Sequence, residues 1–140
     1  MSNVSLGQAR VIVDNALQIA REQGFRPMAI MVVDSAGHSV LGLREDGASH
    51  LRVEIAAGKA GSSIGMGSNS RVLAKRAAEM PGFFSAIAST ASQPFIPQTG
   101  AVLIVQGEEV IGAVGASGGT GDEDELIVVG GIAAAGLSYR

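Results

Sequence analysis

Apolar residues in the first part of the chain change from a helical to a strand-like spacing. Ser5 and Gln8 have the spacing of a capping box, and apolar residues then recur at three- and four-residue steps. This pattern predicts a helix that ends at Gly24. Two short strand-like runs, 28–33 and 38–43, flank a turn-forming segment, so we expect a β-hairpin there.

The middle of the chain has helical patterns with small side chains. Residues 48–62 predict a helix, which the glycines in 61–67 should weaken. A second helix is expected from residue 69 or 70 to about residue 79, and a short apolar helix over 83–91. Segment 93–100 contains two prolines and is expected to be a loop.

The last third predicts a second hairpin and a final helix. The strands of this hairpin are expected at 101–105 and 110–114. A glycine loop should follow at 117–121, and the final helix is expected at 122–137. Without the short apolar helix, the order is therefore α-ββ-α-α-ββ-α. Paired hairpins indicate antiparallel strands, since a parallel pair needs a crossover of about a dozen residues. We expect an α+β fold in which helices cover the sheet.

Composition excludes several classes of function. The 140 residues are 46% hydrophobic and 16% charged, which fits one folded domain. The absence of cysteine excludes disulfides and thiolate chemistry, and no metal-binding motif is present. With a net charge of −3 and no basic stripe, no nucleic-acid partner is expected. No apolar run is long enough to span a membrane and the first residues lack a signal-peptide pattern, so we expect a cytoplasmic protein.

Small residues on the predicted helices favour association between copies of the chain. Helices that carry glycine and alanine can approach one another closely, and a monomer would leave them thinly covered. We therefore expect a homo-oligomer. The positions concerned are Gly58, Gly61, Gly65, Gly130, Gly131 and residues 133–135.

Several short motifs occur in a fixed order along almost the whole chain. They are Val-Val-Asp-Ser-Ala-Gly-His at 32–38, Arg-Glu-Asp-Gly-Ala at 44–48, Ala-Ala-Gly-Lys-Ala at 56–60 and Ile-Gly-Ala-Val-Gly-Ala-Ser-Gly-Gly at 111–119, followed by Asp-Glu at 124–125. In this order and spacing the chain resembles the GlcG/HbpS family, which also occurs as the C-terminal domain of PduO-type proteins.

The resemblance implies both a fold and a class of ligand. It implies one profilin-like domain over residues 1–140, a three-layer α/β/α arrangement with an antiparallel sheet of about five strands, assembled into dimers or larger rings. Members are linked to haem binding and degradation or to cobalamin, and others belong to small-acid or aromatic catabolism. The family's Pro-Gly-Gly loop, which helps line the pocket, corresponds here to Thr99-Gly100-Ala101, so Thr99 and Gly100 are candidate ligand-binding residues.

Two histidines are candidates for chemistry. His38 follows the first predicted turn and His50 lies near the start of a predicted helix. Imidazole titrates near neutrality and binds metals, so either could act as an acid or base or bind the metal of a tetrapyrrole. Both positions also suit solvated polar residues of a turn and a helix start.

Charged residues near the first hairpin form a second candidate group. Arg44, Asp46 and Arg52 are close in sequence, and Lys59 lies seven residues after Arg52 on the same predicted helix face. An arginine could hold a carboxylate or a haem propionate, and Asp46 could orient it or act as a base. Surface ion pairs would be the alternative explanation. Lys59, among alanine and glycine, could be a surface lysine with its charge in water, but we favour a site or interface role.

The glycine loop at 117–121 resembles a phosphate-binding turn, but acidic residues at 122–125 follow it directly. Carboxylates at the start of a helix would repel a phosphate. No nucleotide site is therefore predicted.

These observations leave three hypotheses open. The first is a protein that binds haem or another planar or carboxylated small molecule, with its pocket at a subunit interface. The second is an enzyme of small-acid or aromatic catabolism that uses His38 or Asp46 as acid or base and Arg44 or Arg52 for a substrate carboxylate. The third is a structural accessory protein.

Overall fold

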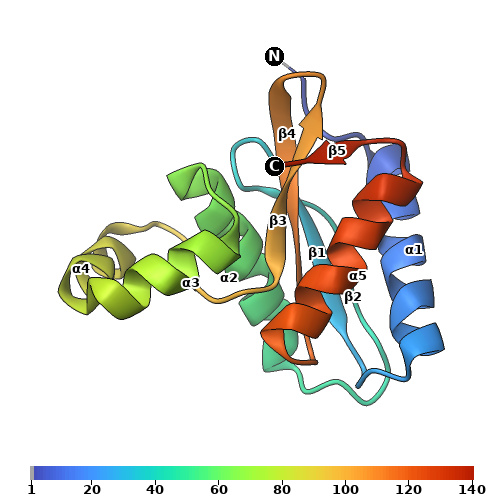
Figure 1. Cartoon of the computed structure of the whole chain (residues 1–140), viewed down its shortest axis with the longest axis horizontal. Coiled ribbons are helices and arrows are strands. Elements are labelled where there is room, and N and C mark those ends of the chain that lie inside the picture. Colours follow the sequence, from blue (N-terminus) through green and yellow to red (C-terminus); the bar gives the residue numbers. More distant parts are fainter. Residues whose placement is uncertain (1) are drawn as a thin grey trace.

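The computed structural model describes residues 2–140 and contains a five-stranded antiparallel sheet between helices (Figure 1). The strand order is β2-β1-β4-β3-β5, and both predicted hairpins are formed by neighbouring strands. The α+β fold class is confirmed. The strands are β1 (Ala29–Asp34), β2 (Ser39–Arg44), β3 (Ala101–Gln106), β4 (Glu109–Ser117) and β5 (Ser138–Tyr139).

Helices cover both faces of the sheet. Helices α1 and α5 lie side by side on one face, while α2 covers β1, β4 and β3 from the other, and α3 and α4 extend outward from α2 (Figure 1). None of the helices within residues 2–140 combines the length and apolar character needed to cross a lipid bilayer. The helices are α1 (Leu6–Gln23), α2 (Leu51–Met66), α3 (Ser70–Glu79), α4 (Pro81–Thr90) and α5 (Gly121–Ala134).

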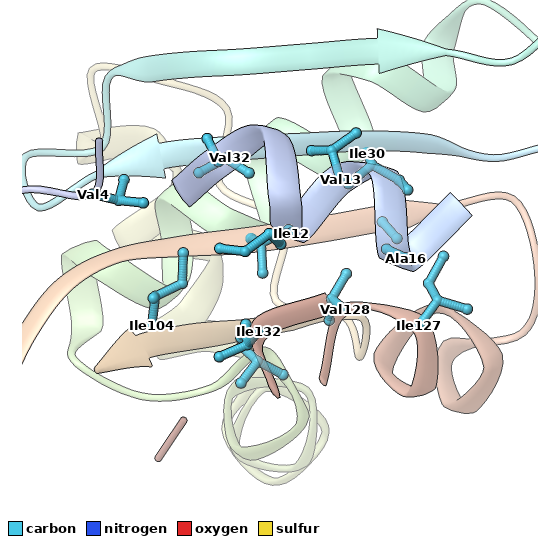
Figure 2. Close-up of a cluster of buried hydrophobic side chains, with 14 of the residues drawn as sticks. Val4, Ile12, Val13, Ala16, Ile30, Val32, Ile104, Ile127, Val128 and Ile132 are labelled. Atoms are coloured by element: carbon cyan, nitrogen blue, oxygen red, sulfur yellow. The ribbon is translucent and has the colours of Figure 1, made fainter. Parts of the chain in front are cut away.

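The main hydrophobic core lies between the sheet and the α1–α5 pair (Figure 2). Helix α1 begins where predicted, because Ser5 Oγ accepts from Gln8 N and Gln8 Oε1 accepts from Ser5 N. Its apolar face then meets the strands and α5, and burial of these side chains supplies the main stabilisation. The core includes Ile12, Val13, Ala16, Ile30, Val32, Ile104, Ile127, Val128 and Ile132.

Three of the small helical residues serve packing within the chain. A Cβ atom at Gly130 would overlap the Ile19 side chain, and one at Gly131 would overlap the Ile12 carbonyl oxygen, so both glycines permit the close α1–α5 contact. Gly58 similarly leaves room for Ile96. Gly65, in contrast, has no neighbour within 4 Å of a built Cβ and faces open space.

Helix α2 differs from its predicted range. It begins at Leu51 rather than at residue 48, and it continues through the glycine-rich segment to Met66. Packing of α2 against the sheet offsets the low helix propensity of glycine, so tertiary contacts decide its length. The helix ends at Gly67, whose φ of 69° is the left-handed conformation that glycine adopts readily.

The sheet has one strand more than the four that the pattern predicts. Helix α5 ends at Ala134 instead of residue 137, and Gly136, with φ of 72°, reverses the chain. Ser138 and Tyr139 then pair with Val105 and Ile104 on the edge of β3. A two-residue strand is too short to show an alternating pattern in sequence.

Candidate functional site

A buried ion pair connects α2 to the start of α5. Lys59 Nζ lies 3.1 Å from Asp124 Oδ2, and the two side chains are 6% and 2% exposed. The same ammonium group donates to the Ala116 carbonyl oxygen at 3.0 Å. One lysine therefore joins α2, the end of β4 and α5. Lys59 is thus a buried residue with a specific partner and not a surface lysine.

Arg52 reaches the same end of β4 from two turns earlier on α2. Its Nη1 donates to Ser117 Oγ at 3.1 Å, and Ser117 is fully buried. Because Ala116 and Ser117 are consecutive, the cationic groups of Arg52 and Lys59 converge on one short segment. Within residues 2–140, no carboxylate lies within ion-pair distance of Arg52. Most of its guanidinium donors are therefore available to a ligand.

Burial changes the acidity of Asp124. Its Oδ1 accepts a hydrogen bond from the Gly119 backbone N–H at 2.9 Å. Loss of solvation raises the pKa of Asp124, and this effect exceeds the opposing influence of Lys59, the Gly119 N–H and Arg52. The carboxyl group consequently holds a proton more readily than an exposed aspartate does.

The other acidic residues at the start of α5 have partners outside the buried pair. Glu123 completes a capping box with Thr120, while Asp122 and Glu125 both pair with Arg71 of α3. Asp124 is the one whose side chain turns inward to Lys59. The acidic cluster predicted at this helix start is therefore divided between capping, an exposed ion-pair group and the buried pair.

A cavity of about 470 Å³ lies over this arrangement, between α2, the residue 98–99 segment and the start of α5. Its lining is mainly polar, and Ile55 adds one large apolar side chain. Its polar lining includes Arg52, Lys59, Thr99, Ser117, Thr120 and Asp124.

Gly100 allows the loop before β3 to lie against the ion pair. A Cβ atom at this position would lie 2.7 Å from Lys59 Nζ and 3.0 Å from the Asp124 Cβ, and its φ is 137°. Both the space and the backbone conformation therefore require glycine. The Gly100 carbonyl also accepts from Ala116 N, which holds the loop to β4.

A family model described as the haem-degrading protein HbpS-like matches residues 4–133. The chain belongs to the HbpS-like family. This confirms the resemblance that the sequence motifs indicated. A search of curated proteins finds no significant match to this HbpS-like chain.

Solved structures of similar proteins share the fold over nearly the whole HbpS-like chain. The protein ORFY of Klebsiella pneumoniae is 26% identical, with 97% of this chain and 92% of that chain covered and a TM-score of 0.87. A double mutant of HbpS from Streptomyces reticuli is 25% identical, with 95% and 87% covered and a TM-score of 0.83. A PduOC–haem complex, at 20% identity, has 99% of both chains covered and a TM-score of 0.87, which shows a common fold.

The structure brings together half of the candidate site residues that were predicted from the sequence. Arg52, Lys59 and Thr99 line the cavity, and Gly100 lies directly against the ion pair. His38 instead lies in a separate hollow of about 290 Å³, formed with the C-terminal part of α2 and the segment around Phe95.

The remaining predicted residues lie at the surface outside the cavity. Arg44 ends β2, and Asp46 and His50 lie in the connection between β2 and α2; all three are exposed. They are not among the residues that line the cavity. A catalytic role of His38 or Asp46 stays a prediction.

The sequence pattern did not indicate that Asp124 and Ser117 are parts of the site. Both belong to motifs that carried the family resemblance, but neither pattern indicates which side chain turns inward. A usable signal existed in Lys59, since a lysine among alanine and glycine on a packed helix requires a carboxylate partner if it is buried.

Proposed function

We propose that this HbpS-like chain binds a small carboxylated molecule, haem or another planar acid, in the cavity between α2 and the start of α5. The observation that carries the proposal is Arg52, a half-buried arginine that lines the cavity without a carboxylate partner among the described residues. Its planar fork of donors suits a carboxylate. The family description and the haem complex of PduOC support haem as a candidate ligand.

Haem fits this cavity only in part. Arg52 and Thr99 could hold a propionate group. Among residues 2–140, those that line the cavity include no histidine, methionine or tyrosine to bind iron and no aromatic ring to cover the macrocycle. We therefore base the proposal on recognition of a carboxylate and not on ligation of iron.

Titration with haemin and with haemin dimethyl ester tests this proposal. Replacing Arg52 with methionine should weaken haemin binding by about tenfold to a hundredfold, because charged hydrogen bonds contribute about 1.5–3 kcal/mol. The ester should bind the natural chain more weakly than haemin does. Visible absorbance would report both affinities. Arg10→Met, which removes an exposed arginine of α1, is the matched control.

One result of the titration would contradict the proposal. If haemin and its ester bind equally well, and Arg52→Met binds as the natural chain does, carboxylate recognition by Arg52 is wrong. Loss of haemin binding in His38→Ala alone would instead indicate that haemin binds in the hollow around His38.

A homo-oligomer, with this cavity at a subunit interface, is the second part of the proposal. Large apolar side chains remain exposed on and beside α4, including Phe83 at 51% and Met80 at 42%. Contact between copies would remove such side chains from water. Light scattering at micromolar concentration should give a mass that is a multiple of 14.1 kDa. A monomer mass under these conditions would exclude the oligomer.

A further inference from the structure

The Lys59–Asp124 pair has features that stability alone does not explain. A buried ion pair gains little over apolar residues of similar size, because desolvation of two charges offsets their attraction. This pair also lines a cavity, next to Arg52, which has no carboxylate partner within residues 2–140. An ionisable group that lies in a cleft and whose pKa is shifted by burial, as that of Asp124 is, is typical of functional sites.

We propose that Asp124 and Lys59 act as an acid–base pair that transfers a proton at the carbon next to the carbonyl of a 2-oxo acid held by Arg52. The inference rests on the proposed carboxylate binding by Arg52 and adds a reaction to it. It assigns the chemistry to two residues that the sequence did not connect.

The positions of the Arg52 and Lys59 cationic groups at the end of β4 indicate the class of substrate. Arg52 Nη1 and Lys59 Nζ contact the consecutive residues Ser117 and Ala116. A carboxylate on Arg52 would therefore place a neighbouring oxygen atom toward the Lys59 ammonium group. A 2-oxo acid has such an oxygen on the carbon that is bonded to its carboxylate.

The proposed step is a keto–enol tautomerisation. Asp124, as the carboxylate, takes a proton from C3 of the substrate, and the electron pair of that C–H bond forms the C2=C3 double bond. The carbonyl electron pair moves to oxygen, which the Lys59 ammonium stabilises and protonates. Return of both protons restores the starting state. The step needs no oxidant or reductant.

The local environment suits a base at this position. Asp124 Oδ1 accepts one N–H from Gly119 and Oδ2 accepts one from Lys59, so each oxygen keeps a further lone pair. Burial raises the pKa of Asp124, which makes the carboxylate a stronger base than an exposed one. The Lys59 donor beside it is held by the Ala116 carbonyl oxygen.

Deuterium exchange at C3 tests the inference. Pyruvate, 2-oxobutyrate and phenylpyruvate would each be incubated with the protein in D₂O, and the loss of the C3 proton signal followed by NMR. Exchange should exceed the buffer rate by about a hundredfold for at least one of them, the scale of general acid–base catalysis. Asp124→Asn should return it to the buffer rate. Asp14→Asn, the same change at an exposed aspartate of α1, should exchange as the natural chain does.

Arg52→Met serves as a second variant that leaves the ion pair intact. It should raise the substrate concentration for half-maximal exchange at least about tenfold, with little change in the maximal rate, since it removes binding and not the base. An unchanged half-saturation would contradict the assigned role of Arg52, even if Asp124→Asn failed to fold.

Failure of the inference and failure of the proposed function have different results. If none of the three acids exchanges above the buffer rate, the acid–base role of Asp124 and Lys59 is overturned. Saturation-transfer NMR on the same samples then reports whether the acids bind. Binding that depends on Arg52 without exchange would leave the proposed function standing.

Discussion

Replacing Lys59 with methionine is expected to lower the free energy of unfolding by about 3–5 kcal/mol, since it leaves Asp124 buried without its cation. Asp124 is 2% exposed and reaches solvent only at the cavity, so water replaces the lost ammonium group incompletely. The Ala116 carbonyl oxygen also loses a donor. Urea unfolding followed by circular dichroism would measure the change. Lys75→Met, at an exposed position of α3, should change the free energy by no more than about 0.5 kcal/mol.

A double variant separates the loss of the pair from the loss of one partner. Lys59→Met combined with Asp124→Leu removes both charges and should recover much of the stability, because apolar replacements of buried ion pairs are often neutral or favourable. Equal stability of Lys59→Met and the natural chain would show that the pair is solvated or absent. A double variant less stable than Lys59→Met would argue that the pair contributes net stability.

Replacing Gly115 with alanine is expected to destabilise the protein by about 1–3 kcal/mol, the usual cost of overpacking. A Cβ atom at Gly115 of β4 would overlap the Ala56 carbonyl oxygen and approach Ala60 N of α2. Backbone atoms of a packed helix cannot move aside as a flexible side chain can. The strain should therefore displace α2 from β4 and disturb the contact between Lys59 and Ala116. Thermal unfolding combined with the haemin titration would detect both effects.

Gly65→Ala is the matched control for this prediction. Gly65 lies in the same helix α2, but nothing is within 4 Å of a Cβ built there. Alanine should stabilise the helix by about 0.5–1 kcal/mol, because it restricts the unfolded backbone and favours helix. Destabilisation by both alanine variants to the same extent would contradict the packing argument at Gly115.

Local patterns in the sequence were sufficient for most of the secondary structure. The capping box of Ser5 and Gln8, the two hairpins and the helix that ends at Glu79 depend on interactions between residues close in sequence. Segments with such local signals form the same element in many contexts. The order of the motifs also indicates the HbpS-like family without any tertiary contact.

Tertiary structure decided the features that depend on residues far apart. Packing against the sheet extended α2 through its glycines, and pairing with β3 created the strand at Ser138–Tyr139. These outcomes depend on partners that the local pattern does not contain.

The candidate site was also decided by tertiary structure. The seven-residue spacing of Arg52 and Lys59 predicts that they share one helix face, and the structure places both at the cavity. Asp124 could not be singled out from the acidic residues around it, because only the tertiary fold places the start of α5 within reach of the Lys59 side chain. The two partners are separated by 65 residues. Helix periodicity reports which residues share a face, whereas the partner of a buried charge is determined by how the sheet brings distant helices together.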